Sequence, residues 1–332
     1  MIKKLLFLIV LLFGMSQAKI LMFNDISVEP INKQANPDFQ APKQQHRKGV
    51  YLVSYADGDE IFFKNQNTLA LSALNKGIDF ILNYRRSHLD PDFLQKNARI
   101  LNAPRGAGYW LWKPWVILKT LNTVPENATV VYADTGFVFR NNIQKLLELT
   151  KNKDISLIYY DPKTFDKTVE SHASRNTLER MQCDTPQCRQ KPHLWAGFMV
   201  LKNTPKSRAF IKKWLHYASD PNIMMGVPDA RKPYPEFKNH LDDETILSVL
   251  HAKEPQGKFL IEANELLSNY VFWHHRKPGN YNGTSYTTLL PRMFKQIRGI
   301  ERKILNSYPM EKIRQFLLEH MPTIYQQTPK KG

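Results

Sequence analysis

Apolar runs of strand length alternate with longer stretches in which apolar and polar residues repeat with helical spacing. The strand-length runs lie at residues 49–56, 78–84, 129–133, 155–160 and 196–201. Helices are expected between and after them, at residues 62–76, 109–121, 142–150, 175–181, 207–217 and 242–250. Strands separated by helices predict an α/β fold with a mostly parallel sheet and helices on both faces.

No repeat and no internal linker interrupts this alternation, so residues 49–285 are expected to form one domain. Residues 19–48 are polar and proline-containing, and they predict an extended leader in front of it. Residues 286–332 predict a basic helical tail behind it. Apolar residues repeat there with helical spacing, and lysines and arginines lie between them, so the tail is expected either to pack on the domain or to contact a membrane surface peripherally.

The first 18 residues have the layout of a secretory signal peptide. Lys3 and Lys4 precede an apolar run at residues 5–15, and small residues follow at Ser16 and Ala18. The run is shorter than the ~20 apolar residues of a typical spanning helix, which favours cleavage over an uncleaved N-terminal membrane anchor. The chain is therefore expected to be exported.

The chain carries a formal net charge of +17. This excess favours an anionic ligand such as a nucleotide diphosphate, or an anionic surface of lipid or lipopolysaccharide. Nucleic acid is not expected as a partner, because no helix-turn-helix, zinc-finger or RNA-recognition pattern organises the charge. The two cysteines, Cys183 and Cys188, suit one small disulfide loop in an exported chain, and their surroundings do not have the spacing of a zinc site.

The most informative stretch is Arg105-Gly-Ala-Gly-Tyr-Trp-Leu-Trp-Lys-Pro-Trp115, which joins a glycine-rich turn to basic and aromatic residues. Exposed indoles are costly unless something covers them, so the stretch predicts a ligand pocket. Further along, Val130-Val-Tyr-Ala-Asp-Thr-Gly136 predicts a buried strand that ends in a carboxylate. Ligands bind at the carboxyl ends of strands in open α/β sheets, so the two segments are expected to form one site.

These two segments and three others resemble, in order along the chain, bacterial nucleotide-sugar glycosyltransferases of the GT-A fold, of the capsular polysaccharide and lipopolysaccharide type. The five motifs are Arg105 to Pro114, Tyr132 to Gly136, Trp195 to Phe198, Trp214-Leu215 and His240 to Ser248. Five motifs in one order are more specific than any single motif. The resemblance implies a GT-A, Rossmann-like sheet and an enzyme that moves a sugar from a nucleotide diphosphate donor to a glycan, lipid or protein hydroxyl.

The resemblance also implies that Asp134 is a catalytic residue. In the family a strand-terminal Asp-x-Asp typically holds a divalent cation, Mn²⁺ or Mg²⁺, which bridges the donor diphosphate. Tyr132 stands in the place of the first acid here, so a metal would need another protein ligand. His274 and His275 are candidates, because many enzymes of this fold supply a late histidine to the metal. An Asp at a strand end also caps ordinary turns, and a His-His-Arg-Lys run also suits a solvated turn.

Several residues are candidates for donor binding. Arg105 and Lys113 are expected to bracket the donor phosphates, with Gly108 letting the backbone approach closely. Trp112 is expected either to stack on the donor or to belong to the core. Asp57, after the first strand, suits a plain turn as well as a nucleotide contact. The resemblance adds Ser54, Tyr55, Tyr132, Gly136 and Gly197.

Asp243 is the second catalytic candidate, since it matches an acid that lies near the acceptor hydroxyl and the donor sugar in the family. Glu244 replaces the family's glutamine, and Asp242 adds another acid. Acids in the first turn of a helix also favour the helix dipole, which explains all three without catalysis. An inverting enzyme needs a carboxylate base beside the acceptor hydroxyl, whereas a retaining enzyme does not; retention is the expectation.

Other chemistries lack their motifs. The sequence has no Gly-x-Ser-x-Gly elbow of serine hydrolases, no Walker or dinucleotide fingerprint and no His-Glu-x-x-His zinc helix. The main alternative is a secreted, non-catalytic carbohydrate-binding or surface-interaction protein on a degenerate GT-A fold, to which the incomplete acidic motif points. A third hypothesis is a basic protein that acts at a membrane surface through its tail.

Overall fold

The structure is a computed structural model that describes residues 49–165, 167–227, 232–255 and 257–273. The predicted signal peptide, leader and helical tail lie outside these residues, and so do His274 and His275. The described residues belong to one unit of the chain. Its strands and helices alternate, which confirms the α/β class.

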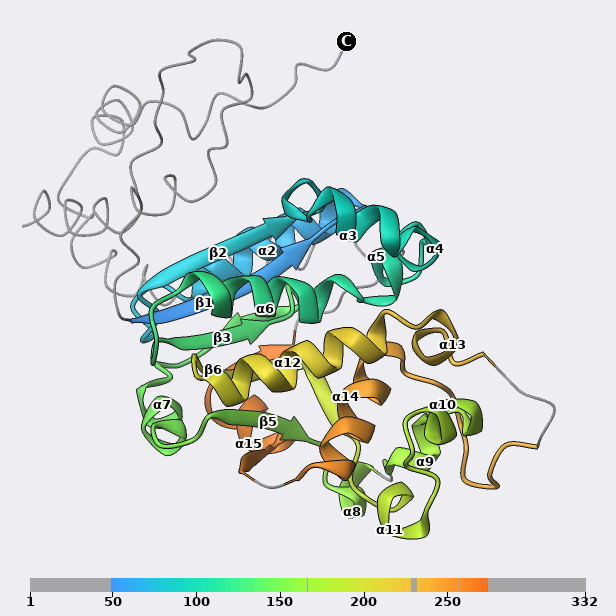
Figure 1. Cartoon of the computed structure of the whole chain (residues 1–332). Coiled ribbons are helices and arrows are strands. Elements are labelled where there is room, and N and C mark those ends of the chain that lie inside the picture. The colour runs from blue at the N-terminus through green and yellow to red at the C-terminus, as the bar shows by residue number, and fades with distance from the viewer. Residues whose placement is uncertain (1–48, 166, 228–231, 256, 274–332) are drawn as a thin grey trace, which may run out of the picture. The chain divides into compact units, whose positions relative to one another are not determined.

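A six-stranded sheet forms the centre of this unit (Figure 1). Its strands are β1 (Val50–Ala56), β2 (Phe80–Arg85), β3 (Thr129–Ala133), β5 (Ile155–Tyr159), β6 (Leu194–Lys202) and β7 (Lys258–Glu262), in the order β2-β1-β3-β6-β5-β7. The pairs β1–β2, β1–β3 and β5–β7 are parallel, and β6 is antiparallel to both neighbours. The sheet is therefore mostly parallel, as predicted, but it contains one reversed strand.

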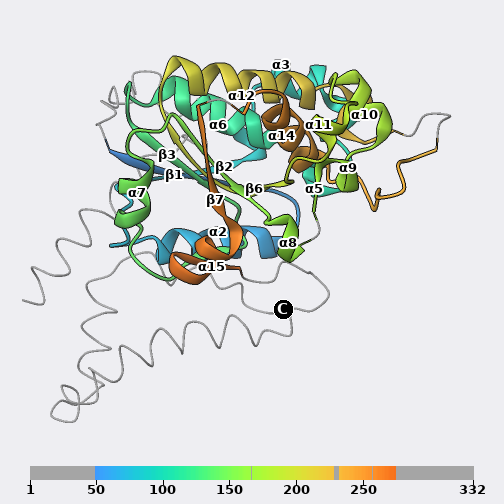
Figure 2. The same ribbon diagram turned by 90° about the horizontal axis from the view of Figure 1, so that it is seen from below.

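Helices cover both faces of the sheet (Figure 2). One face carries α6 (Trp112–Thr123), α12 (Pro205–Ala218) and α14 (Asp242–Lys253), and the other carries α2 (Glu60–Ser72) and α15 (Ala263–Asn269). Each set encloses a hydrophobic cluster. Strand β3 contributes side chains to both clusters, because successive side chains of a strand point to opposite faces of the sheet. Val130 and Tyr132 belong to the first cluster, and Val131 and Ala133 belong to the second.

Short elements connect these layers. They are the 3-10 helix η1 (Arg86–His88), the helices α3 (Pro91–Lys96), α4 (Ala98–Leu101), α5 (Gly106–Tyr109), α7 (Gln144–Thr150), α8 (Pro162–Phe165), α9 (Val169–His172), α10 (Arg175–Arg180), α11 (Pro186–Arg189) and α13 (Pro221–Met224), and the antiparallel pair β4 (Phe137–Phe139) and β8 (Val271–Trp273). The helices α8 to α11 follow β5 before the chain enters β6. Because the end of β5 pairs with the start of β6, the chain re-enters the sheet at the edge where it left, which reverses β6.

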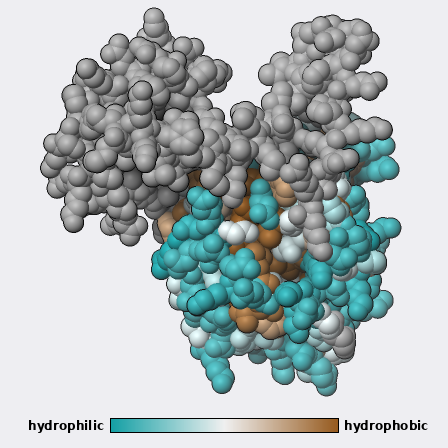
Figure 3. Space-filling model, turned by 90° about the vertical axis from the view of Figure 1, so that its left-hand side faces the viewer, coloured by the Kyte–Doolittle hydropathy of each residue, from teal (hydrophilic) through white to brown (hydrophobic). Residues whose placement is uncertain are grey.

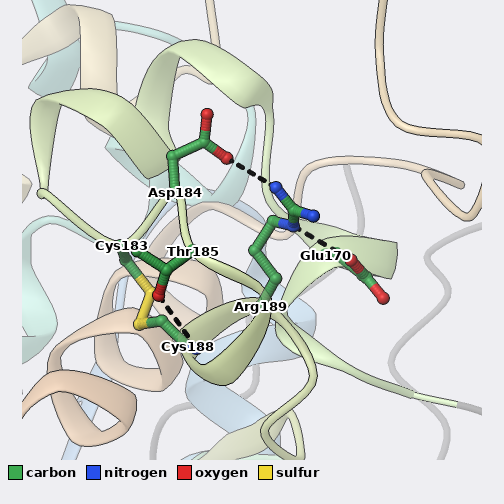
Figure 4. Close-up of a disulfide and its surroundings, with 6 residues drawn as sticks. All are labelled: Glu170, Cys183, Asp184, Thr185, Cys188 and Arg189. Atoms are coloured by element: carbon green, nitrogen blue, oxygen red, sulfur yellow. Dashed lines mark hydrogen bonds and ion pairs between the residues drawn. A yellow bond between two sulfur atoms is a disulfide. The ribbon is translucent and has the colours of Figure 1, made fainter.

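Cys183 and Cys188 form a disulfide between the end of α10 and α11, which confirms the predicted small loop (Figure 4). Ion pairs surround this bridge. The Arg189 guanidinium lies 3.1 Å from Asp184 Oδ1 and 3.2 Å from Glu170 Oε2. The disulfide and the pair with Asp184 fix α11 to the segment before it, and the pair with Glu170 joins α11 to α9.

The surface of the described part carries few large exposed hydrophobic residues. Figure 3 shows one face on which a hydrophobic strip lies between hydrophilic side chains. Leu71 of α2 and Leu149 of α7 are 56% and 52% exposed. Single exposed residues of this kind are normal for a folded domain. No helix among residues 49–273, where the structure describes them, is long and apolar enough to cross a membrane.

Candidate active site

The carboxyl ends of β1 and β3 meet at one edge of the sheet, because these strands are parallel neighbours. β6 begins at the same edge, since it runs antiparallel to β3. Asp134 follows β3, and its backbone N–H donates to the carbonyl of Gly197 at 2.8 Å. A Cβ on Gly197 would lie 3.2 Å from Asp134 Oδ2 and 2.8 Å from Trp195 Nε1. The fold thus brings two candidate residues together and leaves almost no room for a side chain at position 197.

Residues 106–110 form a turn of left-handed helix beside this edge. The φ angles of Gly106, Ala107, Gly108, Tyr109 and Trp110 are +57°, +50°, +100°, +51° and +61°. A left-handed conformation costs roughly 1–2 kcal/mol for each residue that carries a Cβ. Backbone hydrogen bonds hold the turn, with Tyr109 N–H donating to Arg105 O at 2.7 Å and Trp110 N–H to Gly106 O at 3.3 Å.

Two glycines make this turn feasible. A Cβ on Gly106 would lie 2.4 Å from the Trp110 ring, and a Cβ on Gly108 would lie 2.6 Å from the Cα of Leu101. Strained backbone of this kind is found mainly at ligand and active sites, where the surrounding structure maintains it. Gly108 therefore serves close packing of the turn on α4.

A pocket of about 720 Å³ opens beside Asp134. Tyr55 and Trp112 form one wall, with their rings stacked at 4.1 Å and 17°. Trp112 Nε1 also donates to the carbonyl of Gly106 at 3.0 Å, which ties this wall to the left-handed turn. The lining residues lie at positions 55–59, 62, 86, 101–104, 106–107, 110, 112 and 134–135. The volume suits a ligand of nucleotide size, since small-molecule sites usually measure about 300–1,000 Å³.

Lys113 lies in the interior and is not among the residues that line the pocket; only 2% of its side chain is exposed. Its Nζ is 2.6 Å from Asp243 Oδ2 and 3.5 Å from Asp134 Oδ1. The hydroxyl of Tyr132 donates to the same Asp134 oxygen at 2.6 Å. Lys113 is therefore an internal counter-ion of both candidate catalytic carboxylates, a different role from the phosphate contact expected from its sequence motif.

Burial and charge determine the protonation of this cluster. Burial acts to lower the pKa of Lys113, but Asp134, Asp243 and Glu244 outweigh it, so its pKa is raised. Burial raises the pKa of Asp243 to about 6, although Lys113 opposes the shift. Burial and the neighbouring Asp243 raise the pKa of Glu244 to about 8. Burial thus favours the neutral form of both acids, and Lys113 favours their ionised forms.

A second ion pair joins the left-handed turn to the start of α14. Arg105 Nε and Nη2 donate to Asp242 Oδ2 at 3.0 and 2.7 Å. The Asp242 side chain is 5% exposed and that of Arg105 is 51% exposed, so the guanidinium keeps access to solvent. Burial raises the pKa of Asp242, and the hydrogen bonds from Arg105 oppose this.

Two further donor-binding candidates, Ser54 and Gly136, lie outside the pocket lining. Ser54 is fully buried, and its hydroxyl donates to Asn83 Oδ1 at 3.0 Å and accepts from Gln66 Nε2 at 2.9 Å. Gly136 lies in the turn that links β3 to β4, which the Phe137 N–H closes by donating to Asp134 O at 3.0 Å. Neither Ser54 nor Gly136 lines the pocket.

Arg86 lines the pocket, although its sequence surroundings did not single it out. Its guanidinium lies 3.7 Å from Asp57 Oδ2, and the hydroxyl of Tyr55 donates to the same oxygen at 3.0 Å. The position of Arg86 in the sequence could have identified it, because Arg86 directly follows β2, the parallel neighbour of β1. Parallel neighbours end at one edge of a sheet, so a basic residue at that position is close to the expected site.

The described residues of this site do not fit a divalent cation by themselves. No group of three or more His, Cys, Asp or Glu in the part of the chain that the structure describes is arranged to hold a metal. Asp134 Oδ1 already contacts the Tyr132 hydroxyl and the Lys113 ammonium. The predicted ligands His274 and His275 lie outside the described residues, so no chemical step is assigned to a metal.

Comparisons place the chain beside distant solved structures, whereas no protein-family model and no curated protein matches it. Mouse xyloside xylosyltransferase 1 in its apo form is 11% identical with a TM-score of 0.39, over 68% of this chain and 95% of that one. The galactosyltransferase LgtC, with donor and acceptor sugar analogues, is 13% identical with a TM-score of 0.35, over 63% of this chain and 72% of that one. A glycosyltransferase involved in glycosylation of the major capsid of PBCV-1 is 8% identical with a TM-score of 0.37, over 66% of this chain and 87% of that one.

Proposed function

We propose that this chain is a glycosyltransferase that moves a sugar from a nucleoside diphosphate donor to a hydroxyl of a glycan, lipid or protein. One observation carries the proposal: an Asp134–Lys113–Asp243 cluster adjoins a pocket of about 720 Å³ at the carboxyl edge of a mostly parallel sheet. The five ordered motifs of the GT-A resemblance support the same activity, and three of them supply the cluster residues Lys113, Asp134 and Asp243.

The pocket has the groups that a nucleotide donor needs. Tyr55, Trp110 and Trp112 offer aromatic surface to a base or a sugar. Arg86 lines the pocket and carries a positive charge for the diphosphate. Arg105 does not line the pocket but directly precedes Gly106, which does. A guanidinium has five N–H donors, so Arg105 retains donors for phosphate oxygens after its two bonds to Asp242.

The proposed reaction breaks the bond between the anomeric carbon and the phosphate oxygen, and that oxygen leaves with the electron pair as part of the nucleoside diphosphate. The acceptor hydroxyl oxygen forms the new bond to the anomeric carbon, and its proton passes to the leaving phosphate or to solvent. Positive charge develops on the sugar in between. We assign its stabilisation to the Asp134 carboxylate, which lines the pocket. We assign to Asp243 the positioning of Lys113 and of the acceptor side of the site.

Metal assistance and the stereochemical outcome are two further parts of the proposal. Metal assistance stays a prediction, because it requires His274 or His275. Retention of the anomeric configuration also stays a prediction, and the anomeric proton signal of the product in an NMR spectrum tests it.

The test measures release of nucleotide from UDP-, GDP- and CMP-sugars by the purified full chain, with and without Mn²⁺ or Mg²⁺. Asp134→Asn removes the strand-end charge, and Asp92→Asn removes an exposed charge on α3 as the matched control. We expect turnover of one donor, a loss of at least about tenfold in Asp134→Asn, and no change in Asp92→Asn.

Other outcomes distinguish the alternatives. Tight binding of a sugar or glycan without release of nucleotide from any donor would support the non-catalytic carbohydrate-binding protein instead. Turnover that Asp134→Asn leaves intact would contradict the site assigned here, even if the chain is a transferase.

A further inference from the structure

The sheet edge continues past Asp134 on the side of β5 and β6, away from the pocket wall of Tyr55 and Trp112. The end of β5 pairs with the start of β6 at this edge. Tyr160 follows β5 and Trp195 lies at the start of β6, with their rings stacked at 5.8 Å and 27°. Both side chains are partly exposed. They form an aromatic surface, which we call the Tyr160–Trp195 platform.

The platform lies next to the candidate catalytic carboxylate. The Cβ position of Gly197 is 2.8 Å from Trp195 Nε1 and 3.2 Å from Asp134 Oδ2, so the indole and the carboxylate are close neighbours. Helix α14 packs against the same strand, because the backbone N–H of Leu194 donates to Ser248 Oγ at 2.9 Å. A sugar on the platform would therefore present its hydroxyls toward Asp134.

A lysine ammonium lies over this platform, and no carboxylate of the described residues forms an ion pair with it. Lys167 Nζ lies 3.9 Å from the centroid of the Tyr160 ring, and the side chain is partly buried. Within the described residues, no Asp or Glu oxygen makes an ion pair with Lys167, whereas Arg105, Lys113 and Arg189 each have one. A partly buried charge is costly unless it is paired, so this position favours an anion.

Three titratable groups act on Lys167 from the elements around it: Glu244, Lys238 and His172. Glu244 from α14 faces it and acts to raise its pKa, while burial, as the largest effect, and Lys238 act to lower it. Burial raises the pKa of Glu244, which weakens it as a counter-ion, although Lys113 and Lys167 oppose the shift. His172 from α9 also faces Lys167, and burial lowers its pKa, so it adds no charge at neutral pH.

We propose that Lys167 recognises an anionic group on the acceptor, so that the acceptor is an acidic saccharide whose ring packs on the Tyr160–Trp195 platform. Aromatic rings bind the apolar faces of sugars, and an ammonium is a compact point charge that accepts carboxylate, phosphate or sulfate partners. The inference rests on the proposed function, since only a transferase needs a second sugar beside Asp134. It identifies the class of acceptor, which the sequence motifs do not.

The test is binding of the full chain to an array of neutral, uronate-bearing, phosphorylated and sulfated oligosaccharides, without any donor. We expect retention of acidic glycans only, weaker at high salt because the contact is ionic. Lys167→Met is expected to lose at least about tenfold in affinity, the equivalent of one charge-assisted hydrogen bond. Lys167→Arg keeps the charge and is expected to keep most of the binding. Lys163→Met, which removes an exposed lysine of α8, is the matched control.

Each outcome decides the inference. A uronate, phosphate or sulfate preference identifies which anion Lys167 accepts. Equal binding of neutral glycans, no retained acidic glycan, or unchanged binding by Lys167→Met would overturn it. Donor hydrolysis without acceptor, measured in parallel, separates this result from the proposed function. Donor hydrolysis without any preference for acidic glycans would support the proposed function and contradict the inference. Binding of acidic glycans without donor hydrolysis would support only the acidic-glycan site.

Discussion

Replacing Lys113 with methionine tests whether its buried ammonium holds the two aspartates in place. Methionine retains an unbranched apolar side chain, so the change removes the charge with little change in shape. Lys113 Nζ is 2.6 Å from Asp243 Oδ2, and the two side chains are 2% and 5% exposed. Removing one partner of a buried ion pair typically costs about 3–5 kcal/mol, because the other charge stays buried without compensation. We expect a loss of that size in the free energy of unfolding at pH 8.

The loss is expected to be smaller at pH 5. The folded-state pKa of Asp243 is about 6, above that of an exposed aspartate, so ionisation of Asp243 destabilises the fold as pH rises toward and through 6. Removing Lys113 raises that pKa further, because Lys113 acts to lower it. Each added unit corresponds to about 1.4 kcal/mol between the two protonation states. The raised pKa of Lys113 keeps it protonated at both pH values, so the difference comes from the acids beside it, from Asp243 and, toward pH 8, also from Glu244.

Urea unfolding followed by tryptophan fluorescence at pH 5 and pH 8 measures both losses. Lys119→Met, at an exposed position of the same helix α6, controls for the substitution itself. Lys113→Met combined with Asp243→Asn removes both charges and is expected to be more stable than Lys113→Met alone at pH 8. A loss below about 1 kcal/mol at pH 8, or equal losses at both pH values, would refute the counter-ion role, since either result means that no buried charge was left unpaired.

Three further predictions follow from the same geometry. Gly108→Ala is expected to lower the melting temperature far more than Gly257→Ala, as thermal unfolding measures. Both glycines have a positive φ, but only at Gly108 would a Cβ meet a backbone atom, at 2.6 Å. Cys183→Ser with Cys188→Ser is expected to cost about 2 kcal/mol in urea unfolding, as estimated for closing so short a loop, and a reductant should destabilise only the native chain. Tyr132→Phe removes the hydroxyl that donates to the strand-end aspartate at 2.6 Å, and donor turnover is expected to fall about tenfold with little loss of stability; unchanged turnover would contradict the assigned site.

The layers of the fold follow from local sequence patterns, whereas strand direction does not. The five strand-length apolar runs all became strands of the central sheet, because burial on both faces requires continuous apolar residues. The strands β4 and β8 have three residues each, too few to show alternation. The direction of β6 depends on where α8 to α11 fold after β5, and that packing is not visible in the residues of β6 itself.

The sequence predicts the position of a site residue that directly follows a strand. It does not predict positions that depend on the left-handed turn at residues 106–110. Asp134 follows a buried strand, so its place at the sheet edge follows from the pattern alone. Arg105 and Lys113 flank the same glycine-rich motif, and the sequence prediction treats this motif as a loop from which both side chains reach the ligand. The left-handed turn instead starts α6 at Trp112, so that Trp112 forms the pocket wall and the next side chain, Lys113, enters the interior. Successive helical side chains point about 100° apart, so the residue at which the helix starts decides which of the two meets the ligand. The glycines of the motif thus act first on backbone shape, and through it they set the pairing of Lys113 with the candidate catalytic carboxylates.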